Sequence, residues 1–110
     1  MKNRQVLQPL LQREFDILDT VTLLKRTNIN VWFSWGVSKM VNVDDKGLLL
    51  KVRGHHHKGY VFVTLGWEDL FQVHIISTQG NIKESIEGIF FDNLQSIIDE
   101  KVERVKEYVY

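Results

Sequence analysis

Four short turns divide the middle of the chain, and their length limits the fold more than any other feature. They fall at Asp44–Gly47, Gly54–Gly59, Gly66–Asp69 and Ser77–Asn81, and each contains glycine. Loops this short join antiparallel neighbours, because a parallel pair of strands needs a crossover of about a dozen residues or more. Glycine also supplies the backbone freedom that tight turns need. The sequence therefore predicts an antiparallel meander of four or five strands.

The segments between the turns alternate between apolar and polar residues, which is typical of strands. The predicted strand segments are 29–43, 48–53, 60–65, 70–76 and 82–87. The first is too long for one ordinary strand, and Gly36 provides a bend within it. In the segment 60–65 the valines face the core, whereas Tyr60 and Phe62 face outward.

Two predicted helices flank the strands. Residues 8–26 place apolar side chains at steps of three and four, and Pro9 is tolerated only in a first turn, so the helix begins there. After the strands, Asp92 and Gln95 have the spacing of a capping box, and an apolar stripe continues to Val109. We therefore predict an α+β fold in which all 110 residues form a single domain, with both helices on one face of the sheet.

Composition excludes several classes of protein. The hydrophobic fraction of 44% is too high for a disordered chain, and no apolar run reaches the ~20 residues of a membrane span. Without cysteine there is no disulfide framework, thiolate zinc site or cysteine nucleophile, so we expect a cytoplasmic protein. The charged N-terminus lacks the features of a secretory signal.

Charge is divided unevenly along a chain whose formal net charge is zero. Residues 1–60 carry ten basic and five acidic residues, whereas residues 61–110 carry four basic and nine acidic ones. This asymmetry can mark two faces with different partners, or two halves that attract each other within one fold. The neutral total argues against a protein whose main work is to grip phosphates.

The histidines are the first candidates for chemistry. His55, His56 and His57 are adjacent in a hairpin loop, and adjacent strand residues point to opposite faces, so the three cannot easily share one metal ion. We expect no metal site; His55 and His57 are the candidate ligands if one exists. His74 could act as a general base, but no nucleophile or orienting acid lies nearby in sequence. With no other catalytic motif, we expect a non-enzymatic protein without a cofactor.

The segment Lys58–Leu65 resembles the first ribonucleoprotein motif of RNA-recognition domains, whose aromatic side chains stack on bases. It departs from that motif at Val61 and Leu65, and the predicted order of elements lacks the helix that such domains place between their first two strands. Aromatic and basic side chains nevertheless share the outward face. Single-stranded nucleic-acid binding is therefore the alternative function, through Lys51, Arg53, Lys58, Tyr60, Phe62 and His74.

Large apolar side chains on the outward face favour a contact surface. A sheet covered on one face should expose polar residues on the other, but the outward positions hold Trp32, Leu49, Tyr60 and Phe62, with Met40 as a further member. Such patches mark interfaces unless a helix or loop covers them. We therefore expect a small protein-interaction module that binds a protein partner or a second copy of itself, as a homodimer.

Three segments carry a resemblance to other proteins. Leu50–Gly54, Lys58–Leu65 and Gly88–Asp99 are similar to short uncharacterised proteins of phages and mobile elements of gut Bacteroidetes. The resemblance covers roughly residues 48–103, and its motifs are strand, turn and cap residues. It transfers no catalytic residue, and it implies a small accessory protein without known activity.

Overall fold

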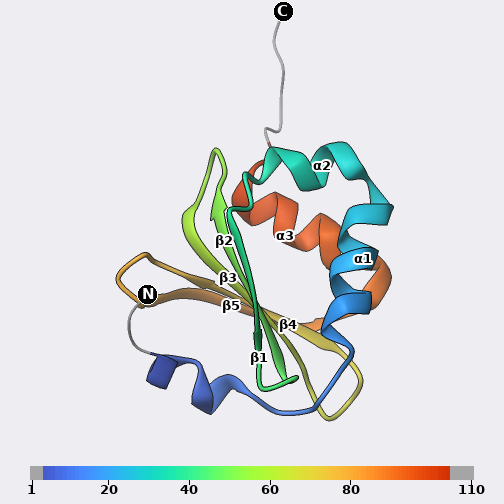
Figure 1. Ribbon diagram of the computed structural model, residues 1–110, viewed down its shortest axis with the longest axis vertical. Coiled ribbons are helices and arrows are strands. Elements are labelled where there is room, and N and C mark those ends of the chain that lie inside the picture. Colours follow the sequence, from blue (N-terminus) through green and yellow to red (C-terminus); the bar gives the residue numbers. More distant parts are fainter. Residues whose placement is uncertain (1–3, 105–110) are drawn as a thin grey trace, which may run out of the picture.

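A five-stranded antiparallel sheet forms the centre of the molecule, and its strands follow one another in chain order (Figure 1). The computed structural model describes residues 4–104. The strands are β1 (Lys39–Val43), β2 (Gly47–Arg53), β3 (Lys58–Leu65), β4 (Phe71–Ile76) and β5 (Ile82–Ile89). The helices are α1 (Ile17–Thr27), α2 (Ile29–Ser34) and α3 (Leu94–Val102), with 3₁₀ turns at Arg4–Val6, Gln8–Leu10 and Phe91–Asn93. The predicted α+β fold and its antiparallel meander are confirmed.

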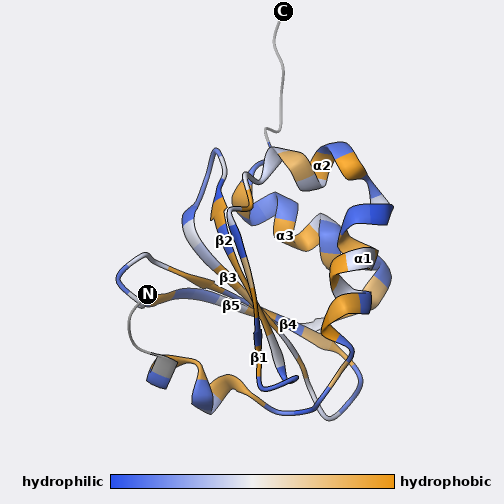
Figure 2. Cartoon of the chain, in the orientation of Figure 1, coloured by the Kyte–Doolittle hydropathy of each residue, from blue (hydrophilic) through white to orange (hydrophobic). Residues whose placement is uncertain are grey.

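The three helices cover one face of the sheet, and helices and strands both carry hydrophobic residues (Figure 2). The apolar side chains of the two layers pack together in one core. Trp35 is fully buried in this core, and its Nε1 donates to Asp99 Oδ1 at 3.0 Å. Gln95 Nε2 donates to the carbonyl oxygens of Leu24 and Asn28, at 2.6 and 2.9 Å. These bonds tie α3 to α2 and to the junction between α1 and α2. None of the helices within residues 4–104 has the length and apolar character needed to cross a membrane.

The opposite face, which we call the outer face, is covered in part by the N-terminal segment 6–11 (Figure 1). Leu7 of this segment is 0% exposed. Val6, Leu10 and Leu11 are partly buried beside it against the strands. The side chains that it covers form a second core, made of Val41, Val43, Leu49, Tyr60, Phe62 and Ile76.

The N-terminal helix is shorter than predicted. It begins at Ile17, and Pro9 lies instead in a separate 3₁₀ turn. The leucines around Pro9 were expected to form a helical stripe, but they cover the outer face of the sheet. The chain then runs extended, and the Arg13 N–H donates to Leu65 O at 3.1 Å. Asp16 ends this extended segment, because its carboxylate caps the first turn of α1.

Residues 29–34 form α2, so the prediction of a strand from residue 29 is wrong, and only Lys39–Val43 of that segment is strand. The Asn28 side chain caps α2 by accepting from two backbone N–H groups of its first turn. Trp32 and Trp35, one helical turn apart, both face the core, with ring centroids 5.7 Å apart. A spacing of three residues puts both side chains on one face of a helix, although the neighbouring apolar residues alternate as in a strand.

The predicted capping box of Asp92 and Gln95 does not form. A 3₁₀ turn precedes α3, and its N-cap residue, Asn93, makes no side-chain cap bond. The buried Gln95 side chain bonds to the helix junction instead, since a buried amide needs partners there. α3 ends at Val102, and the predicted stripe position Val109 lies outside the described residues.

Replacing Leu7 with alanine tests whether the N-terminal segment is part of the folded core. Loss of this fully buried side chain should lower the free energy of unfolding by about 2–5 kcal/mol, because transfer energy is lost and a cavity remains. Urea denaturation followed by circular dichroism measures the difference. The matched control is Leu18→Ala, at a leucine that is 75% exposed, which should change stability by at most about 0.5 kcal/mol. Equal effects in the two variants would contradict the packing.

Candidate functional site

Five side chains predicted to lie on an exposed binding surface are buried, and one of them is His74, at 4% exposure. Leu49 (6% exposed), Tyr60 (7%) and Phe62 (0%) lie on the outer face, but beneath the segment 6–11. Trp32 (5%) lies on α2, in the core between helices and sheet. The prediction that these residues form an exposed patch is therefore wrong, because leucines expected in a helix cover three of them. The structure instead has the alternative left open by the sequence, in which another part of the chain covers the apolar side chains of the sheet.

The basic residues predicted on the outer face do come together. Lys51, Arg53 and Lys58 line a pocket of about 320 Å³ beside the β2–β3 hairpin. We call this region the basic end of the sheet. Burial of Tyr60 and Phe62 removes them as platforms on which bases could stack.

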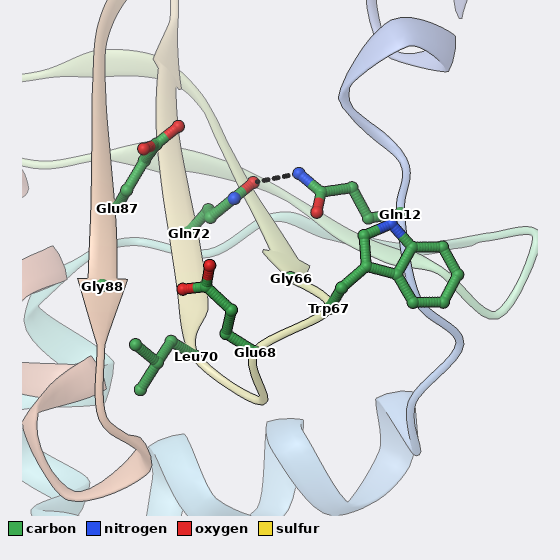
Figure 3. Close-up of a pocket in the computed structure, with 8 residues that line it drawn as sticks. All are labelled: Gln12, Gly66, Trp67, Glu68, Leu70, Gln72, Glu87 and Gly88. Carbon is green, nitrogen blue, oxygen red and sulfur yellow. Dashed lines mark hydrogen bonds between the residues drawn. The ribbon is translucent and has the colours of Figure 1, made fainter.

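A second pocket lies at the other end of β3, where the β3–β4 turn approaches the end of β5 (Figure 3). Its volume is about 420 Å³. Trp67, on the turn, is 73% exposed, so it is available for contact with a ligand. We call this the Trp67 pocket, and its lining comes from separate parts of the chain: Gln12, Gly66, Trp67, Glu68, Leu70, Gln72, Glu87 and Gly88.

Backbone hydrogen bonds fix the turn that carries Trp67 and Glu68. The Gly66 N–H donates to Leu70 O at 2.8 Å, and the Asp69 N–H donates back to Gly66 O at 3.1 Å. Asp69 has a φ of 63°, in the left-handed region, and its carboxylate pairs with Arg13 in the extended chain that follows the segment 6–11. The pocket wall is thus anchored to this extended chain.

Amides and carboxylates give the Trp67 pocket its polarity. Gln72 Oε1 accepts from Gln12 Nε2 at 3.3 Å (Figure 3). It also accepts from Thr64 Oγ1 at 3.1 Å. Glu68 of the turn and Glu87 of β5 both lie beside Gln72 in this view. None of the lining residues is basic, so the pocket is negatively charged at neutral pH.

His74 lies two residues beyond Gln72 on β4 and is 4% exposed. Its Nδ1 is 2.7 Å from Ser85 Oγ on β5, and its buried Nε2 has no hydrogen-bond partner among the described residues. Burial lowers the pKa of His74, and the nearby Glu87 carboxylate opposes this shift. The imidazole is therefore neutral at pH 7. Ser85 is a hydroxyl neighbour that sequence order alone does not bring to His74.

The candidate metal ligands are not arranged as a site. His57 is 3% exposed, with Nε2 3.1 Å from Tyr60 O and Nδ1 3.4 Å from Lys83 Nζ. Burial lowers the pKa of His57, and the Lys83 ammonium lowers it further. His55 lies exposed in the hairpin. Within residues 4–104, no group of three or more histidine, aspartate or glutamate side chains could hold a metal ion.

Sequence reasoning missed the Trp67 pocket because its parts are far apart in the chain. Trp67 and Glu68 were assigned only to a turn, and Glu87 only to an edge strand. One signal in the sequence was available: Trp67 lies in a short glycine turn, next to Glu68 and Asp69. A large aromatic residue in a short turn is rarely buried, so this position indicates an exposed indole.

Folding stability should decrease as the pH falls below about 6.5, the ordinary histidine value. Burial lowers the pKa values of His57 and His74 in the folded protein, so the unfolded chain takes up protons first and is favoured in acid. The stability that comes from keeping the two histidines neutral is fully present above that pH. It is lost as the pH falls toward the lowered pKa values of the folded protein. Urea denaturation between pH 5 and pH 8 measures it. The double variant His57→Gln, His74→Gln should have a flatter profile over this range; an unchanged slope would contradict the assignment.

The comparisons with known proteins give no relative. The chain matches no protein-family model, no curated protein and no solved structure. Its function must therefore be inferred from its own side chains.

Proposed function

We propose that the chain is a non-enzymatic protein-interaction module that binds a lysine or arginine side chain of a partner protein in the Trp67 pocket. The observation that carries the proposal is the combination in one pocket of an indole that is 73% exposed with two carboxylates and no basic lining residue. Such a role agrees with the small accessory protein that the sequence resemblance implies.

Three interactions support a cationic side chain as the ligand. Carboxylates of Glu68 and Glu87 attract an ammonium or guanidinium group, although an exposed ion pair alone contributes only about 0–1 kcal/mol. The Trp67 ring adds a cation–π interaction of about 0.5–1 kcal/mol at an exposed site. Leu70 offers apolar surface to the methylene groups of a lysine or arginine. Together these weak terms suit a transient partner.

The proposal that the protein is not an enzyme rests on the surroundings of His74. Its Nδ1 contacts Ser85, but the His74 side chain is 4% exposed, and neither residue lines the Trp67 pocket or the pocket at the basic end of the sheet. A hydrolase needs a base that exchanges protons at the reacting atoms. We therefore assign the His74–Ser85 pair a structural role, as a hydrogen bond between β4 and β5.

The partner is proposed to be a different protein. Self-association was expected from an apolar outer face, and the segment 6–11 now accounts for burial of Leu49, Tyr60 and Phe62 within one chain. These three side chains are therefore not free to pack against a second copy.

Calorimetric titration with a synthetic peptide of alternating glycine and lysine tests the proposal. Glu68→Gln, Glu87→Gln and Trp67→Ala should each weaken binding by about three- to fivefold, since each removes an interaction of roughly 0.5–1 kcal/mol. Glu100→Gln removes the same charge from an exposed position on α3 and should leave the affinity unchanged. A peptide with glutamate in place of lysine should not bind.

Two results would refute the function. One is equal weakening by Glu100→Gln and by the pocket variants, which would indicate only general attraction to an acidic surface. The other is lysine-peptide binding that does not alter the fluorescence of Trp67. This signal can be assigned because Trp32 and Trp35 are buried, at 5% and 0% exposure.

A further inference from the structure

The basic end of the sheet holds like charges directly opposite each other. In the β1–β2 ladder Lys39 is paired with Lys51, and in the β2–β3 ladder Arg53 is paired with Lys58. Like charges directly opposite on neighbouring strands destabilise a sheet. Two such pairs, on adjoining ladders, bring four cations to one end of the sheet.

None of the four cations forms an ion pair in the described part of the chain. The ion pairs within residues 4–104 lie elsewhere: Arg13 with Asp69, Lys101 with Glu84, and Arg104 with Asp99. The four cations therefore contribute nothing to the fold through ion pairing. An arrangement that costs stability and lacks an internal counterion suits an external anion.

The cations also surround a cavity. The pocket of about 320 Å³ at this end is lined by Lys51, Arg53 and Lys58, together with the hydroxyl residues Ser38 and Thr78. No acidic residue contributes to the lining. Ammonium, guanidinium and hydroxyl groups are all donors, and a phosphate offers only acceptors and negative charge to them.

We propose that this end of the sheet binds the phosphate groups of a single-stranded nucleic acid. Cations on three adjacent strands can contact successive phosphates of one flexible strand, whereas a single small anion would meet only some of them. Because Tyr60 and Phe62 are buried, neither offers its ring to a base, so binding through these cations is independent of base sequence and strongly dependent on salt. This site is separate from the Trp67 pocket, and either can exist without the other.

Fluorescence anisotropy with a labelled oligo(dT) strand at low salt tests the site. The double variant Arg53→Gln, Lys58→Gln should weaken binding by about tenfold or more. It should also reduce the slope of log K against log salt by about 0.7 for each phosphate that the variant no longer neutralises. The control double variant, Arg26→Gln, Lys46→Gln, removes the same charge from an exposed helix position and from the β1–β2 turn. It should bind as the unmodified protein does.

Thermal melting of the same variants separates binding from folding. Arg53→Gln, Lys58→Gln removes a repulsive pair, so its melting temperature should equal or exceed that of the unmodified protein. A stable variant with unchanged affinity would overturn the proposal. So would equal weakening in the control double variant, which would indicate diffuse attraction, or the absence of binding at tens of micromolar protein. Binding of oligo(dT) and of an oligo(dA) strand should be equal; a marked base preference would also contradict a site made only of phosphate contacts.

Discussion

The central strands are apolar on both faces, and the rest of the structure depends on covering them. Nearly every residue of β2 and β3 is buried, whichever way it points. Strands of that kind need a layer on each side of the sheet. The helices supply one layer, and the segment 6–11 supplies the other, with Leu7 fully buried. Since this segment packs on the sheet, α1 can begin only later, at Ile17. The last strand, β5, is largely exposed, and the Trp67 pocket lies beside its end.

Local patterns predicted the sheet because its turns and alternation are local. The short glycine turns gave the order of the strands, and the two parities of Leu48–Arg53 correctly separated residues of the two cores. Prediction failed where one pattern fits two structures. The segment 29–34 alternates like a strand, but Asn28 caps it as a helix. The leucines near Pro9 could form the apolar stripe of a helix or could pack as a cover on the sheet. Only the apolar outer face of β2 and β3 decides between these two structures.

The candidate site was less predictable because it depends on strand register. An unbroken ladder from the loop 77–81 would set His74 opposite Glu84. A shift in the β4–β5 pairing sets His74 opposite Ser85 instead, and turns Glu84 toward α3, where it pairs with Lys101 at 2.9 Å. A one-residue slip changes which side chains share a face. Nothing in the alternation of these strands marks the irregularity, so the neighbours of His74 follow only from the three-dimensional pairing.

The neutral total charge argued against phosphate binding, and the fold removes that argument. Lys58 begins β3, whereas Glu68 follows its end. Eight strand residues span roughly 25 Å. The Debye length at physiological ionic strength is about 8 Å, so charges at the two ends are largely screened from each other. The electrostatic potential at each end is therefore set mainly by the charges at that end. A sheet of this length lets one small domain keep a basic end and an acidic end apart, because the apolar residues that hold it together occupy the strands between them.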